Sequence, residues 1–258
     1  MKKNVLLSLF ILLLVYEGHS QRYNSEPNYV GNDRPSFFSR FYKLKIGFRF
    51  SPGFIINDVE SSKNFRGFAS NGVRVRPSLG PVVDMYITDK YAFSTGFWYT
   101  VKSVNYTMHG NFYDNELFKM NPLTSDEVRG TGANFNLQYL QLPLTLKIFS
   151  DQIVQDTPIF LQFGGTLDLK IAERALDKSR NALFQYQERL PASQSIFGLG
   201  DVRLLIGIGG EKSINRGGDA IFFGIQYQRG LTEINRDSSF GDLVTKIGAL
   251  YLDFGVKF

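Results

Sequence analysis

The sequence predicts an all-β protein: an eight-stranded antiparallel transmembrane β-barrel with short periplasmic turns and long extracellular loops. Three observations predict this fold. An export signal precedes the folded part, eight stretches alternate apolar with polar or small residues, and long and short connections alternate between them. A strand with an apolar face and a polar or small face is typical of a barrel wall in lipid.

The first twenty residues resemble a secretory signal peptide. Lys2 and Lys3 form a basic start, an apolar run covers Val5–Val15, and small residues precede an expected cleavage site after Ser20. The apolar run is shorter than the ~20 residues that a membrane-spanning helix needs. We therefore expect a signal peptide at 1–20, a periplasmic N-terminal tail at 21–41 and an outer-membrane barrel domain at 42–258.

Each predicted strand has an apolar row expected to face lipid and a polar or small row expected to face the lumen. The last stretch is the clearest example, because Val256 and Phe254 alternate with Lys257 and Asp253. Pro143 lacks the N–H that a sheet ladder needs, so it predicts a bulge in the fourth strand. The expected strands are Tyr42–Phe50, Val73–Ile87, Tyr91–Val104, Phe135–Phe149, Ile159–Ile171, Val202–Lys212, Ile221–Leu231 and Lys246–Phe258.

The connections between these strands are alternately long and short. Short connections at one end and long ones at the other are typical of outer-membrane barrels, with the short turns in the periplasm. Within one long connection, the apolar residues of Ala172–Tyr186 recur at helical spacing, which predicts a short amphipathic helix. This helix could cap the barrel mouth or form a docking surface. The long connections are 51–72, 105–134, 172–201 and 232–245, and the short ones are 88–90, 150–158 and 213–220.

The lumen-facing rows carry ten basic and four acidic residues. An eight-stranded barrel is only wide enough for side chains to fill it, and buried charges must be paired or hydrated. We therefore expect a salt-bridged plug of side chains and water, with no conducting pore. The basic residues are Lys43, Lys45, Arg49, Arg74, Arg76, Lys102, Lys147, Lys170, Arg203 and Lys257, and the acidic ones are Asp84, Asp168, Glu211 and Asp253.

The composition offers little for catalysis or cofactors. There is no cysteine, so cysteine metal sites and thiol nucleophiles are excluded, and the net charge of +5 is spread along the chain. His109 has Ser103, Asp114 and Glu116 nearby in sequence, but their spacing is not diagnostic of a catalytic group. We therefore predict no enzyme, no catalytic, cofactor-binding or metal-binding residues, no cofactor, no nucleic acid and no small-molecule substrate.

Two adjacent strands resemble a known family. QYLQLPLTLKIF and IFLQFGGTLDLKI are similar to the central strands of the PorT-like outer-membrane β-barrels of Bacteroidota, in which a Tyr-Leu-x-x-Pro-Leu strand precedes a glycine-containing one. The resemblance covers about residues 42–258, and DKYAFSTGFWYTVKSVNY and FFGIQYQRGLTEI also contribute to it. The matching positions are Tyr139, Leu140, Pro143, Leu144, Gly164, Gly165, Gly224, Tyr227, Gly230 and Leu231.

The resemblance implies a non-enzymatic component of type IX protein secretion or gliding in the outer membrane of a Gram-negative cell. Its expected partners are outer-membrane lipid and proteins of a secretion or envelope complex. Three other interpretations stay open: a surface adhesin or envelope-stabilising barrel, a rim enzyme using His109, and a secreted soluble carrier of lipocalin type.

Overall fold

The computed structural model describes residues 43–62, 65, 67–108, 132–150, 157–178, 181–187, 195–214, 219–235, 240 and 242–258. The predicted signal peptide at 1–20 and tail at 21–41 lie outside these residues and stay predictions. The elements are β1 (Lys43–Ser61), β2 (Phe68–Ser70), β3 (Arg74–Tyr86), β4 (Tyr91–Gly96), β5 (Trp98–Met108), β6 (Gly132–Phe149), β7 (Ile159–Leu176), α4 (Ala182–Gln187), β8 (Gly200–Ser213), β9 (Ala220–Gly230) and β10 (Leu243–Lys257).

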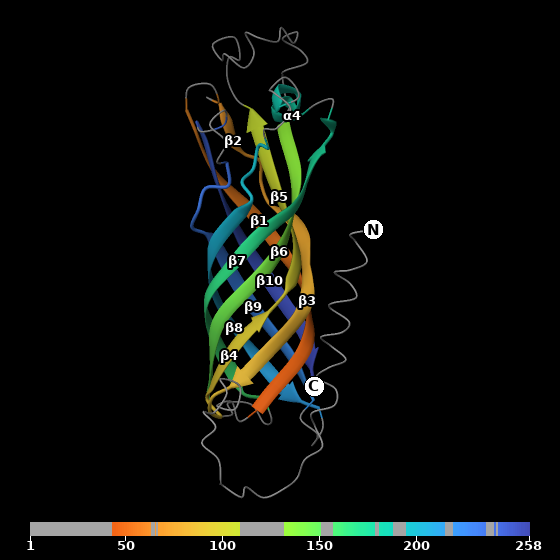
Figure 1. Cartoon of the computed structure of the whole chain (residues 1–258), viewed down its shortest axis with the longest axis vertical. Coiled ribbons are helices and arrows are strands. Elements are labelled where there is room, and N and C mark those ends of the chain that lie inside the picture. The colour runs from red at the N-terminus through yellow and green to blue at the C-terminus, as the bar shows by residue number, and fades with distance from the viewer. Residues whose placement is uncertain are drawn as a thin grey trace, which may run out of the picture. The chain divides into compact units, whose positions relative to one another are not determined.

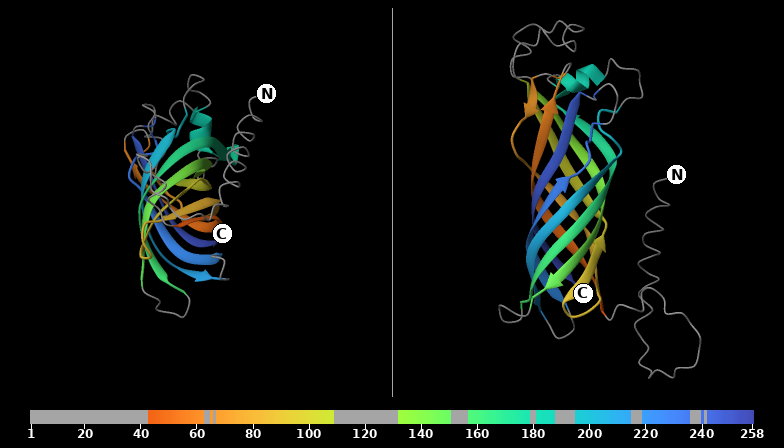
Figure 2. Two further views of the ribbon diagram at one scale, coloured as in Figure 1. Left: turned by 60° about the horizontal axis from the view of Figure 1, so that its bottom comes forward. Right: turned by 90° about the vertical axis from the view of Figure 1, so that its left-hand side faces the viewer.

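The strands form one closed antiparallel sheet (Figures 1 and 2). Closure is made by β1, which pairs with β10 along one side and with β3 along the other. β4 and β5 follow one another in a single position of the wall between β3 and β6, separated only at Phe97. The wall therefore has eight strand positions, as the sequence predicts, and the short β2 adds a pairing to β5 near one end.

Side chains alternate across the wall in the predicted sense. On β8, the outward residues Val202, Leu204, Ile206 and Ile208 are between 43% and 53% exposed, whereas the inward Arg203 is fully buried. Similar exposed apolar rows on β1, β7, β9 and β10 form an apolar outer belt. An apolar exterior around a polar interior is the reverse of a soluble carrier, so the lipocalin-like interpretation is wrong and the belt faces lipid.

The two ends of the barrel differ as predicted. At the lower end in Figure 1, β3 and β4 are joined by residues 87–90, and the strand β10 also ends there. At the upper end lie β2 and α4, in the longer connections. The lower end is therefore the periplasmic end and the upper end the extracellular end. Within the described part of the chain, no helix is long and apolar enough to cross a membrane.

The first strand is much longer than the sequence predicts. We expected it to end at Phe50, but β1 continues to Ser61 and stays in register with β10 throughout its upper half. The Pro52-Gly53 pair is typical of a turn, yet Pro52 lies opposite Pro77 within the continuous pairing of β1 and β3. The predicted 51–72 loop is therefore wrong for its first half, because it belongs to the wall.

The bulge expected at Pro143 is not there. Pro143 keeps its register with Thr166 of β7, and its carbonyl accepts a hydrogen bond of 2.8 Å from the Thr95 hydroxyl of β4. The wall is instead interrupted on the neighbouring strand, at Phe97 between β4 and β5. The register of β6 with β4 and with β5 is the same on both sides of Pro143, so this proline causes no bulge.

The register shift lies near the extracellular end, where a longer helix was expected. Gln138 pairs with Ala172 and Tyr139 with Lys170, so Ile171 is an extra residue in β7. A bulge reverses which residues face inward, and Ala172–Leu176 continue β7 beyond it. The helix predicted over Ala172–Tyr186 is therefore wrong in its first part, which belongs to β7, and correct only for α4.

The short helix α4 caps the barrel mouth. Asn181 precedes it, and its side-chain oxygen accepts a 3.0 Å hydrogen bond from the backbone N–H of Phe184, a typical N-cap. The Asn181 amide group also donates to the carbonyl of Asn134 in β6 at 2.9 Å, and Leu183 is fully buried. These contacts fix α4 on the end of the wall.

The orientation of the outer belt predicts the effect of a charge on it. Ile206 lies outward in the middle of β8, so Ile206→Arg should lower the free energy of unfolding in lipid vesicles by about 2–4 kcal/mol. Urea titrations monitored by tryptophan fluorescence would measure this change. Ile206→Leu is the matched control, and equal stability of the arginine and leucine variants would contradict a lipid-facing Ile206.

Candidate functional site

Five charged side chains from five strands form a continuous chain in the periplasmic half of the lumen. Lys147 of β6 lies 2.9 Å from Asp84 of β3, which also pairs with Lys257 of β10 at 2.5 Å. Lys257 then pairs with Glu211 of β8, and Glu211 lies 2.6 Å from Lys45 of β1. We call this series Lys147–Asp84–Lys257–Glu211–Lys45 the lysine–carboxylate chain. Each carboxylate is shared by two lysines, so the chain links strands around the barrel.

Neighbouring hydroxyl groups support the two carboxylates. The Ser94 hydroxyl donates to Asp84 at 2.5 Å, and the Tyr86 hydroxyl donates to Glu211 at 3.1 Å. All five charged residues of the chain are at most 6% exposed. Because a buried charge is costly without partners, these contacts hold the side chains in one arrangement.

A second charged layer crosses the middle of the lumen. The Arg49 guanidinium of β1 lies 3.6 Å from the ring centroid of Trp98 and 3.0 Å from Asp253 of β10. A planar guanidinium over an indole ring is a favourable cation–π contact. This layer joins β1 to β5 and β10 across the barrel.

A third charged layer lies next to it, on β5, β7 and β8. Lys102 pairs with Asp168, and Arg203 lies 3.1 Å from Asp201. Arg203 also donates to the carbonyl of Ile247 at 2.6 Å. In this layer the two cations are matched by two carboxylates.

The sequence identifies most of these charges. Six of the ten predicted lumen cations and all four predicted acids are buried: Lys45, Arg49, Lys102, Lys147, Arg203, Lys257, Asp84, Asp168, Glu211 and Asp253. Arg76 and Lys170 are half-buried, while Lys43 and Arg74 are exposed at strand ends, so the prediction is wrong for the last two. The water expected among the charges stays a prediction.

The sequence does not identify Asp201, because the predicted sixth strand begins at Val202, two residues after β8 begins at Gly200. Asp201 lies two positions before Arg203 and therefore faces the same side of the strand. Extending the predicted strand by one residue would have identified it as a lumen-facing residue.

The extracellular half of the lumen holds a large apolar cluster beside buried polar residues such as Asn57 and Thr245, and the sequence did not predict this cluster. We call this cluster of buried residues the apolar plug. Its aromatic members contact each other edge to face, as Phe135 and Phe197 do with centroids 5.1 Å apart. The plug consists of Ile55, Phe65, Phe68, Val104, Tyr106, Ala133, Phe135, Leu137, Tyr139, Leu183, Ile196, Phe197, Ile234, Phe240, Leu243, Ile247, Ala249 and Tyr251.

Residues of the connections complete the plug. Phe65 and Phe240 come from two different connections and their ring centroids lie 5.7 Å apart, above the wall residues. Lumen-facing glycines make room for the larger rings: a Cβ at Gly53 would lie 2.3 Å from the Tyr251 ring. Within the described residues, charge pairs fill the lower part of the lumen and close apolar packing fills much of the upper part.

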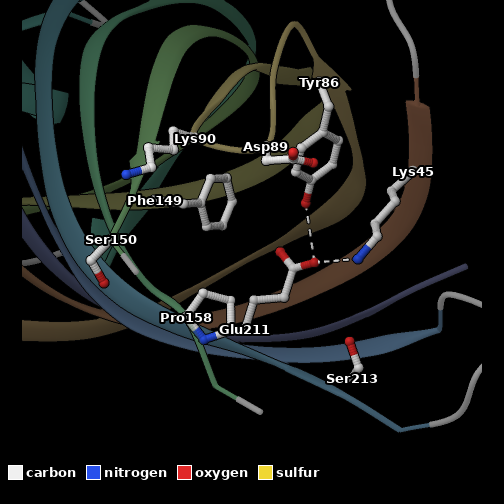
Figure 3. Close-up of a pocket in the computed structure, with 9 residues that line it drawn as sticks. All are labelled: Lys45, Tyr86, Asp89, Lys90, Phe149, Ser150, Pro158, Glu211 and Ser213. Atoms are coloured by element: carbon white, nitrogen blue, oxygen red, sulfur yellow. Dashed lines mark hydrogen bonds and ion pairs between the residues drawn. The ribbon is translucent and has the colours of Figure 1, made fainter. Parts of the chain in front are cut away.

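A pocket of about 300 Å³ opens at the periplasmic end of this lumen (Figure 3). Its floor is Glu211 with the attached Lys45 and Tyr86, and the Phe149 ring stacks on Tyr86 with centroids 5.6 Å apart. The pocket thus combines two lysines, two carboxylates, hydroxyl groups and an aromatic ring at the Lys45 end of the lysine–carboxylate chain. It is lined by Lys45, Tyr86, Asp89, Lys90, Phe149, Ser150, Pro158, Glu211 and Ser213.

The residues considered for a rim enzyme are not brought together within the described chain. Ser103 is fully buried and its hydroxyl donates to Asn105 at 3.2 Å, while His109, Asp114 and Glu116 lie outside the described residues. No group of histidine and carboxylate side chains suited to a metal ion occurs among the residues that the structure places.

The lysine–carboxylate chain predicts a large effect of removing Asp84. In Asp84→Asn, the buried Lys147 loses its ion-pair partner, so the free energy of unfolding should fall by about 3–5 kcal/mol. Urea unfolding in lipid vesicles would measure it. The double variant Asp84→Asn/Lys147→Met should recover part of the loss, and a single variant as stable as the native protein would contradict the buried ion pair.

No family model matches the chain, and no curated protein matches it in sequence. Among solved structures, it is similar to Neisserial surface protein A (NspA), with 12% identity, a TM-score of 0.42, and 83% of this chain and 97% of that chain covered. It is similar to the outer membrane protein OprG of Pseudomonas aeruginosa, with 12% identity and a TM-score of 0.43. The match covers 85% of this chain and 98% of OprG. It is also similar to the outer membrane protease OmpT of Escherichia coli, with 8% identity and a TM-score of 0.43. The match covers 83% of this chain and 96% of OmpT.

The outer-membrane location of this protein does not depend on those similarities. A closed antiparallel ring leaves no strand edge unpaired, and its exposed apolar belt is suited to contact with lipid and not with water. The short turns and the long connections lie at opposite ends, as in the barrels of Gram-negative outer membranes. The protein is therefore an eight-stranded barrel of the outer membrane.

Proposed function

We propose that the protein is a non-enzymatic accessory component of the type IX secretion and gliding machinery, acting through protein contacts made at the ends of its barrel. The observation that carries this proposal is the closed lumen. Among the described residues, charge pairs occupy its periplasmic half and the apolar plug occupies its extracellular half, which supports a role that does not need passage through the barrel. A barrel that conducts nothing acts through its surfaces.

The link to type IX secretion comes from the resemblance to PorT-like barrels. The positions that carry it lie side by side in the wall, because Leu144 of β6 pairs with Gly165 of β7 and Thr145 pairs with Gly164. A Cβ at Gly164 would lie 2.3 Å from the carbonyl oxygen of Leu144, so only glycine fits there. This gives the Pro-Leu and Gly-Gly motifs a shared structural role in the wall, which supports a family likeness in fold.

A deletion strain tests the proposal. Cells without the protein should retain type IX cargo proteins inside the envelope, because the machinery lacks one of its contacts, and a plasmid copy should restore secretion. Quantitative proteomics of culture medium and periplasm would measure the change. Normal secretion of this cargo by the deletion strain would rule out the secretion role.

A second candidate function, surface adhesion or envelope stabilisation, has one favourable observation. Large apolar residues lie exposed next to the extracellular connections, among them Leu199 at 68%, Leu231 at 56% and Val73 at 53%. Such residues suit a contact with another surface. A deletion strain that secretes normally but loses attachment or envelope integrity would favour this function over the first.

A further inference from the structure

A polar contact on the outer face of the barrel joins β3 to β6 across β5. The Arg76 guanidinium of β3 donates to the side-chain oxygen of Asn136 in β6 at 2.9 and 3.1 Å and to the hydroxyl of Ser103 in β5 at 3.4 Å. Ser103 and Asn136 pair directly in the sheet. Their neighbours Val104 and Phe135 belong to the apolar plug and face the lumen, so the contact lies on the outside of the wall.

A second arginine lies beside this contact. Arg174 of β7 is exposed and pairs with Asn136 across the sheet, so Asn136 has an arginine on either side. Arg74, which is also exposed, lies two residues before Arg76 in β3. We call Arg74, Arg76, Arg174, Asn136 and Ser103 the arginine patch.

The positive charge of the arginine patch has no carboxylate partner among the described residues. No arginine of the patch forms an ion pair within this part of the chain. Glu173, next to Arg174, pairs instead with Lys170 at 2.6 Å. The dipeptide Asp177–Lys178, which follows β7, adds no net charge. The patch is therefore suited to an anion that comes from outside the barrel.

The arginine patch lies just beyond the edge of the apolar belt. On β6, the outward Leu140 is 40% exposed, and the next two outward residues toward the extracellular end, Gln138 and Asn136, are polar. Four residues of a strand tilted by ~40° place Asn136 about 10 Å above Leu140 along the membrane normal. Lipid head groups occupy about 5–8 Å on each side of the hydrocarbon, so the side chains of the patch lie close to their level.

Apolar side chains border the patch on β3. Val73 and Val75 alternate with Arg74 and Arg76 at the start of this strand, and the two valines are 53% and 56% exposed. A phosphate-bearing lipid has the same two parts next to each other, an anionic head group and apolar chains. A free anion or an acidic peptide has no need of the valines.

We infer that the arginine patch binds the phosphate group of an anionic lipid of the outer leaflet, whose acyl chains lie along the apolar belt below. The planar guanidinium group donates to phosphate oxygens in pairs, and Asn136 adds amide donors. Arg76 is held in place by Asn136 and Ser103, so little side-chain freedom is lost on binding. This site goes beyond the proposed function and does not depend on it.

A titration with two lipids tests the inference. The probe is dioleoyl phosphatidate, and the reference is dioleoylglycerol, which has the same chains and no phosphate. Each is added to the isotope-labelled full chain in micelles of dodecyl maltoside, a detergent without charge or phosphate, and the backbone amide signals of Ser103, Asn136 and Arg174 are followed. Phosphatidate should give saturable shifts at these amides, and dioleoylglycerol should leave them in place.

Three variants sharpen the test. Arg174→Gln should weaken phosphatidate binding about fivefold, and the double variant Arg76→Gln/Arg174→Gln about twentyfold or more. Lys246→Gln is the matched control. It removes the same charge from an outward position at the same end of the barrel, where Asp58 lies opposite in β1, and it should change nothing. Unchanged amide signals of β9 show that each variant is folded.

Equal shifts with both lipids, or shifts spread evenly along the wall, would overturn the inference, as would equal weakening by Lys246→Gln and Arg174→Gln. Inorganic phosphate binding as tightly as phosphatidate would overturn the lipid part, because the patch would then be a site for free anions. Displacement of phosphatidate by an equal concentration of a tetraglutamate peptide would show that the patch takes an acidic protein segment instead. The secretion test is independent, since it concerns protein contacts and this titration concerns lipid.

Discussion

The structure depends on one constraint: in hydrocarbon, every backbone N–H and C=O group must be paired within the protein. β1 meets this constraint by pairing with β10 from Gly47 to Ser61 and with β3 from Lys43 to Ile55, which closes the sheet on itself. A closed ring needs no edge strand, so its outer surface can be uniformly apolar. Because that surface contacts lipid, the polar residues of every strand must face the lumen.

Eight strand positions then determine what the interior can hold. The space is filled by side chains, and each inward cation has to find a carboxylate or an aromatic ring across the lumen. The periplasmic half does this with the lysine–carboxylate chain, the middle with Arg49, Trp98 and Asp253, and the extracellular half avoids the problem with the apolar plug. The lysine–carboxylate chain ends at the periplasmic pocket, where Lys45 and its partner Glu211 both line the wall.

The alternation of apolar and polar residues was enough to predict the fold and whether most side chains face lipid or the lumen. In a strand, that orientation depends only on neighbouring positions in the sequence. The alternation could not predict which charges meet: Lys257 and Asp84 are 173 positions apart, and their contact requires the register of the closed ring. The apolar plug was missed for a similar reason, since Phe65 and Phe240 come from connections that meet only when the barrel forms. The apolar spacing of Ala172, Ala175 and Leu176 fits a helix as well as a strand end, so the continuation of β7 beyond Ile171 could not be predicted from it.

The central claim is that the apolar row of each strand touches lipid and the charged row turns toward a closed interior. Site-directed spin labelling in lipid vesicles tests it most directly, with labels at outward Leu144, Phe223 and Phe254 and at inward Lys147, Gln226 and Asp253. Labels at the first three positions should collide with lipid-dissolved oxygen and not with a water-soluble nickel reagent, while labels at the last three should be protected from lipid. Contact with water at Leu144, Phe223 and Phe254, together with contact with hydrocarbon at the other three, would show that the barrel is inverted.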